Sequence, residues 1–69
     1  MTFAERKAAL KAAGKTQQHI VRATGFSAVY VHECLKGTRE NAVIRRAIAR
    51  AIGRPLAEVY PESPAAVAV

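Results

Sequence analysis

Gly25 interrupts two short apolar patterns that both have helical spacing, and this break constrains the fold more than any other feature of the chain. Before the break, Ile20, Val21 and Thr24 recur at one, three and four residues. After the break, Ala28, Val31, Cys34 and Leu35 recur at spacings of three, four and seven residues. A glycine supplies the positive φ that a tight turn needs, and Ser27 can cap the helix that follows. The pattern therefore predicts two short helices, 17–24 and 27–36, joined by a tight turn.

Capping residues place three further helices around this pair. Thr2 and Glu5 form a capping box that starts a helix running from Phe3 to Ala13, before Gly14. Asn41 caps a longer helix that ends at Ile52, and Pro55 takes the first position of a short last helix. The expected fold is a compact all-α domain of five helices over residues 1–61, followed by a flexible tail, 62–69. Its expected core is Phe3, Leu10, Ile20, Phe26, Val31, Cys34, Leu35, Ile44, Ile48, Ile52, Leu56 and Val59, with Tyr60 folding back onto it.

The charge balance favours a polyanionic partner. The 69 residues carry 11 Lys and Arg against 5 Asp and Glu, a net charge of +6, and the sequence pI is about 10.3. A pI above about 9 in a small domain is typical of nucleic-acid-binding proteins. The single cysteine excludes an internal disulfide, and no apolar run is long enough for a membrane span. We therefore expect a cytoplasmic protein without a signal peptide, metal site or cofactor, and we find no set of residues suited to catalysis.

Two short helices around a glycine-containing turn form a helix-turn-helix, whose second helix lies in the DNA major groove. Residues 17–36 resemble this motif in the lambda-repressor-like superfamily. Gln17 matches the family's glutamine, Gly25 its turn glycine, and Val31 and Cys34 its two apolar positions in the recognition helix. Val21 departs from the pattern, because the family prefers alanine there. The stretch IRRAIARAIGRPLAEVYPE, 44–62, resembles the last helices of small Ner-type phage DNA-binding regulators.

The resemblance implies which residues meet DNA. Residues that match the base-contacting positions of the recognition helix are Ser27, Ala28, Val29, His32 and Glu33. Their chemistry suits bases: a valine can touch a thymine methyl, a histidine can donate to guanine N7 or O6, and a glutamate can accept from cytosine N4. Expected phosphate contacts come from Gln17, Gln18, Tyr30, Lys36, Thr38 and Arg39.

Several of these residues have alternative roles. Ala28 and Val29 also suit an ordinary helix surface, and Glu33 can instead pair with Lys36 or Arg39. Tyr30 can pack against the first helix rather than bind phosphate. Cys34 occupies an apolar position, so a buried and unreactive thiol is expected. A solvated helix face is the expected environment of Arg45, Arg46, Arg50 and Arg54.

The sequence thus predicts a lambda-repressor-like transcriptional regulator of phage or prophage type that binds specific double-stranded DNA. It is not expected to be an enzyme or to bind a small molecule. Whether it binds DNA as a monomer or a homodimer stays open. The alternative is an antitoxin or adaptor that uses the same fold to bind another protein.

Overall fold

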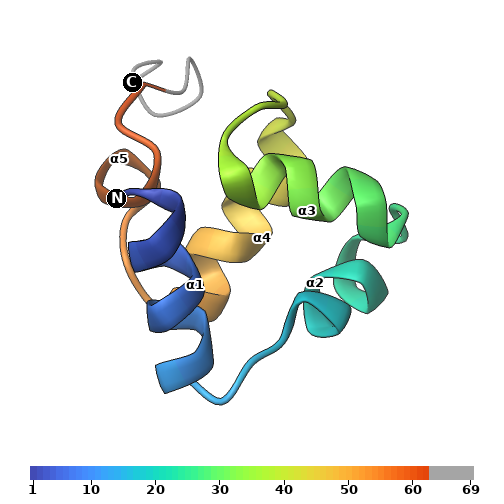
Figure 1. Ribbon diagram of the computed structural model, residues 1–69, viewed down its shortest axis with the longest axis horizontal. Helices are drawn as coiled ribbons and strands as arrows, with labels where there is room; N and C mark the ends of the chain where they lie inside the picture. Colours follow the sequence, from blue (N-terminus) through green and yellow to red (C-terminus); the bar gives the residue numbers. More distant parts are fainter. Residues whose placement is uncertain (63–69) are drawn as a thin grey trace.

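Five helices account for most of residues 1–62, the part of the chain that the computed structural model describes (Figure 1). They are α1 (Phe3–Ala12), α2 (Gln17–Thr24), α3 (Ala28–Lys36), α4 (Ala42–Ile52) and α5 (Leu56–Val59). No strand occurs within these residues, so the predicted all-α class is confirmed. None of the described helices is long and apolar enough to cross a membrane. Of the predicted tail, 62–69, all but Glu62 lies outside the described residues.

Side-chain caps begin the first four helices where the sequence predicts them. Thr2, Thr16, Ser27 and Asn41 each accept a hydrogen bond from the backbone N–H three residues further on. Such a bond satisfies one of the amides that a helix leaves unpaired at its start. The capping box of Thr2 and Glu5 is present, with Thr2 N–H donating to Glu5 Oε1 at 2.7 Å. Three boundaries differ by one residue: α1 ends at Ala12, α3 begins at Ala28 after its cap, and Pro55 precedes α5 as its cap instead of occupying the first turn.

Helix α4 lies at the centre of the molecule and contacts all four other helices (Figure 1). Ile44 and Ile48, one turn apart on it, are fully buried. Because several helices pack around α4, its buried surface extends beyond the predicted core residues Ile44 and Ile48 and includes Ala49 and Arg45. Four residues expected in the core are only partly buried against it: Phe3, Phe26, Ile52 and Leu56.

The expectation that Arg45 lies on a solvated face is wrong. Its side chain is only 3% exposed, and the guanidinium of Arg6 is buried as well. Both guanidinium groups lie over the ring of Tyr60, with Cζ atoms 4.2 Å (Arg6) and 4.4 Å (Arg45) from its centroid. Glu62 is within ion-pair distance of both arginines, at 3.9 and 3.6 Å. A buried aromatic face and a nearby carboxylate thus replace the water that the two cations lose.

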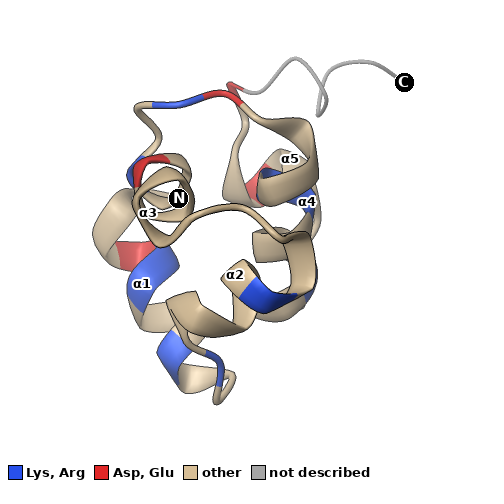
Figure 2. Cartoon of the chain, turned by 90° about the vertical axis from the view of Figure 1, so that its right-hand side faces the viewer, with Lys and Arg blue, Asp and Glu red and all other residues tan. Residues whose placement is uncertain are grey.

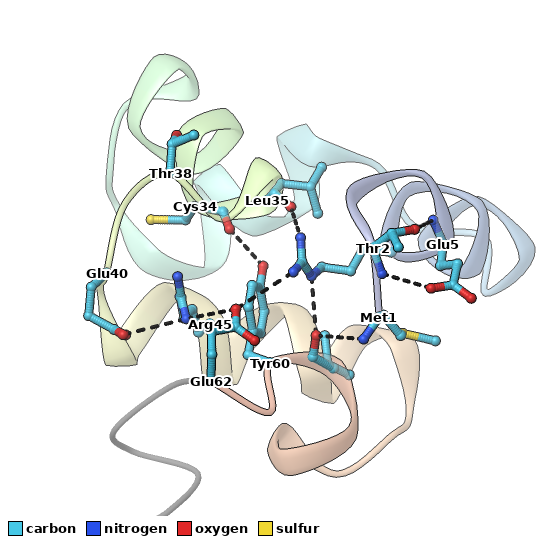
Figure 3. A network of polar contacts seen from close by, with 12 residues as sticks. Met1, Thr2, Glu5, Cys34, Leu35, Thr38, Glu40, Arg45, Tyr60 and Glu62 are labelled. Atoms are coloured by element: carbon cyan, nitrogen blue, oxygen red, sulfur yellow. Dashed lines mark hydrogen bonds and ion pairs between the residues drawn. The ribbon is translucent and has the colours of Figure 1, made fainter.

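Hydrogen bonds from this cluster join segments far apart in the sequence (Figure 3). The hydroxyl of Tyr60 donates to the Cys34 carbonyl at 2.8 Å, and Arg6 donates to the Leu35 carbonyl at 2.6 Å. Arg45 donates to the Arg39 carbonyl at 3.0 Å. The carbonyls at the end of α3 and in the loop after it are therefore held by side chains from α1, α4 and the residue following α5.

Candidate nucleic-acid interface

The turn between α2 and α3 fixes how these two helices lie. Gly25 ends α2 with φ +77°, a left-handed conformation that costs glycine little. Two residues later Ser27 caps α3, its hydroxyl accepting from Tyr30 N–H at 3.2 Å. Val31, Cys34 and Leu35 face inward and are buried. On the opposite side of α3, Ala28, Val29, His32 and Lys36 are exposed and Glu33 is partly exposed.

The exposed side of α3 gathers most of the residues predicted to meet DNA. Ala28, Val29, His32, Glu33 and Lys36 line a shallow hollow of about 450 Å³ together with Gln17 from the start of α2; we call this surface the α3 face. Val29 is 72% exposed, although valine is apolar. Four of the five predicted base contacts thus lie side by side, and Ser27 lies at the start of the same helix.

Gln17 braces this face from α2. Its side-chain amide donates to the Ala28 carbonyl at 3.1 Å, and its Oε1 lies 3.1 Å from Nδ1 of His32. The ring of His32 also packs edge-on against Phe3, with centroids 5.7 Å apart and planes at 89°. His32 itself is exposed, so its ring is held on two sides and open to solvent on the rest. Gln18, the adjacent phosphate candidate, is exposed as well.

The loop after α3 is tied to Glu33. Arg39 Nε donates to the Glu33 carboxylate at 2.8 Å, and this bond raises the pKa of the guanidinium. Thr38 donates from its hydroxyl to the Glu33 carbonyl at 3.1 Å. The structure therefore contains the Glu33–Arg39 pair that the sequence left as an alternative, and it gives the Thr38 hydroxyl an internal partner.

Tyr30 lies beside this loop and is half-buried. Its ring is 5.3 Å from that of Phe26, and the guanidinium of Arg39 lies 5.1 Å over it. The hydroxyl accepts a bond from Asn41 Nδ2 at 3.3 Å. Tyr30 thus packs against the turn before α3 and the loop after it, and its O–H hydrogen is still available to a ligand.

Cys34 is fully buried, and burial raises the pKa of its thiol. A thiol in this environment stays protonated and makes a poor nucleophile. The prediction of a buried cysteine is confirmed.

The excess positive charge is concentrated in particular segments. No Asp or Glu occurs between Glu5 and Glu33, or between Glu40 and Glu58 (Figure 2). Within residues 1–62, ion pairs to glutamates engage four arginines: Arg6, Arg39, Arg45 and Arg54. The cations that have no such pair in this part of the chain are Lys7, Lys11, Lys15, Arg22, Lys36, Arg46 and Arg50.

Three of these cations extend the α3 face toward α1. Lys7, Lys11 and Lys15 border a second hollow, of about 360 Å³, whose floor is formed by apolar residues and which also reaches Gln17 and His32; we call it the α1 hollow. Lys7 and Lys11 are not among the phosphate contacts that the resemblance implies. Their four-residue spacing in a stretch without acidic residues is the signal that would have linked them to the interface.

Comparison with protein-family models, curated proteins and solved structures finds no match to this chain. An exposed helix face with lysines beside it suits contact with a polyanion.

Proposed function

We propose that the protein is a sequence-specific double-stranded DNA-binding transcriptional regulator with a lambda-repressor-like helix-turn-helix formed by α2 and α3. In this proposal α3 enters the major groove and acts as the recognition helix. An α-helix with its side chains is about 10–12 Å in diameter, which suits the roughly 12 Å width of that groove. The resemblance of the sequence to small phage regulators makes a phage or prophage repressor the expected biological role.

The observation that carries the proposal is the coincidence of unpaired charge with the α3 face. Four of the seven cations without an ion pair, all of them lysines, border this face or the adjoining α1 hollow. Phosphate contacts supply much of the affinity of DNA-binding proteins and hold the reading helix in register. Lys36 on the α3 face and the three lysines that border the α1 hollow suit contacts with the phosphate backbone beside a groove.

The other side chains of the α3 face suit base readout. Val29 presents an apolar surface that a thymine methyl can cover, and covering it removes the cost of exposing valine to water. Glu33 offers a carboxylate acceptor already oriented by Arg39. Because Arg39 also offsets its charge, Glu33 can approach DNA with less repulsion from phosphate.

Selection of bound sites from random duplexes tests the proposal directly. A consensus should emerge, and the selected duplex should bind at least ~10³-fold more tightly than a scrambled one of the same length. Titration at several salt concentrations gives an independent measure. With five or six phosphates neutralised per subunit, log K should fall against log salt with a slope near −5, at roughly −0.9 per contact.

Matched variants locate the contact. Lys36→Ala should weaken selected and scrambled duplexes alike and make the salt slope less steep by about one. Arg54→Ala is the control, because Arg54 is also exposed but pairs with Glu58 at 2.8 Å, away from the α3 face. A wild-type slope near zero would contradict DNA binding and favour a protein-interaction module. Equal losses in both variants would contradict the placement of DNA on the α3 face.

A further inference from the structure

The hydrogen bonds of Gln17 determine which ring nitrogen of His32 carries a proton. A backbone carbonyl only accepts hydrogen bonds, so the group of Gln17 that faces the Ala28 carbonyl at 3.1 Å is its NH₂. The amide oxygen Oε1 must then face Nδ1 of His32, also at 3.1 Å. Because Oε1 only accepts, Nδ1 has to be the donor. The opposite tautomer would place two lone pairs against each other at that distance.

Neutral imidazole has one N–H group. With that hydrogen on Nδ1, the distal nitrogen Nε2 is a bare acceptor, and it makes no hydrogen bond within residues 1–62. Phe3 restrains the same ring from the α1 side, so two independent contacts set its orientation. His32 therefore offers solvent an acceptor, and the expectation that the neutral ring donates to guanine does not fit this arrangement.

We propose that His32 reads an exocyclic amino group in the major groove, adenine N6 or cytosine N4, through Nε2, and that Gln17 is the positioning residue that selects this tautomer. The inference rests on the proposed DNA-binding function and specifies its base preference. Adenine and cytosine present these amino groups as donors, whereas guanine presents only the acceptors N7 and O6. Glu33, the next residue, is also an acceptor, so this part of the α3 face favours the same two bases.

The tautomer can be measured in the full-length protein without DNA. At pH 8, above the range in which histidines ordinarily titrate, long-range ¹H–¹⁵N correlation spectra should show the proton of His32 on Nδ1. In Gln17→Ala the population should shift toward Nε2–H, the form that predominates for histidine in water. His19 provides an internal reference, because it is exposed and its ring has no hydrogen bond within the described residues. A wild-type His32 protonated on Nε2 would overturn the inference.

Site selection then tests the base preference, with three variants. His32→Ala should relax one base position that the wild type reads as adenine or cytosine, reducing discrimination there by roughly 5- to 100-fold. Gln17→Ala should relax the same position. Gln17→Glu should bind more weakly overall, because it adds a negative charge. Measured at pH 9, where the ring stays neutral beside the added carboxylate, it should nevertheless keep the adenine or cytosine preference, since a carboxylate oxygen still accepts from Nδ1–H.

Failure of this inference and failure of the proposed function give different results. Guanine at the position that His32→Ala relaxes would overturn the base assignment while leaving DNA binding intact. Equal loss of the preference in Gln17→Glu and Gln17→Ala would also overturn the base assignment and leave DNA binding intact, because a purely structural or phosphate-binding role of Gln17 predicts that result. If no duplex is selected, both the proposed function and the base assignment fail, and the NMR measurement alone decides the tautomer.

Discussion

Replacing Tyr60 by phenylalanine and by leucine separates the two kinds of interaction that hold this side chain in the core. Phenylalanine keeps the ring under the guanidinium groups of Arg6 and Arg45 but removes the hydroxyl that donates to Cys34. Leucine removes both. The Cys34 carbonyl also accepts from Gly37 N–H at 3.1 Å, so loss of the hydroxyl leaves it with one partner.

The expected magnitudes follow from these contacts. Because the carbonyl stays satisfied, Tyr60→Phe should lower the free energy of unfolding by about 1 kcal/mol. Tyr60→Leu should lose that amount, about 1 kcal/mol for each guanidinium–ring contact and about 1 kcal/mol for the smaller side chain. The total is roughly 4 kcal/mol, a large part of the stability of a domain of this size. The corresponding drop in Tm is about 4–8 °C per kcal/mol.

Urea and thermal unfolding, followed by circular dichroism, provide the measurement. Tyr30→Phe is the matched control, because the Tyr30 hydroxyl is half-buried and only accepts a 3.3 Å bond from Asn41; its effect should stay below that of Tyr60→Phe. Equal destabilisation by Tyr60→Phe and Tyr60→Leu would refute the argument that the aromatic face stabilises the two buried arginines.

Three other outcomes are expected. Burial raises the pKa of Tyr60 to about 12, against the opposing effect of Arg6 and Arg45. The tyrosine of the unfolded chain ionises near pH 10. The free energy of unfolding should therefore be unaffected below pH 10 and fall by roughly 2–3 kcal/mol toward pH 12. Urea titrations of the wild type and Tyr60→Phe between pH 9 and 12 measure this, and an identical pH dependence in both would contradict it. Gly25→Ala should lower the free energy of unfolding by about 1–2 kcal/mol through backbone strain alone, since an added Cβ meets no atom within 4 Å. Gly25→Asn should lower it less, because asparagine tolerates positive φ better. Equal unfolding midpoints for the two variants would argue against strain. Lys7→Ala and Lys11→Ala should each make the salt slope of DNA binding less steep by about one, and a slope unchanged in both would remove the α1 hollow from the interface.

Local signals in the sequence were sufficient for the secondary structure. Helix caps and the glycines that follow helices act within three or four residues, so they can be recognised from the neighbouring residues in the sequence. The caps Thr16, Ser27 and Asn41 are examples. The α3 face followed from the same information. Once Val31 and Cys34 point inward, helical geometry turns His32 outward.

Contacts between distant residues were not predictable in this way. In the sequence, Arg45 directly follows the core residue Ile44. Nothing near it indicates that Tyr60 and Glu62, 15 and 17 residues further along the chain, cover its side chain. The bond between Gln17 and His32 joins residues 15 apart, and its direction depends on the Ala28 carbonyl. Periodicity reports which side of a helix is apolar, but it does not report which polar groups meet there.

The loop at residues 37–41 is anchored from the protein interior before any ligand arrives. Arg45 holds the Arg39 carbonyl, Thr38 bonds the end of α3, and Asn41 caps α4. Ordering a mobile side chain on association costs about 0.5–1.5 kcal/mol, and groups that are already fixed avoid that cost. Binding by this loop should therefore carry a small conformational-entropy penalty. Its heat-capacity change, measured by calorimetry, should correspond to the buried surface alone, without the additional contribution of a segment that folds upon binding.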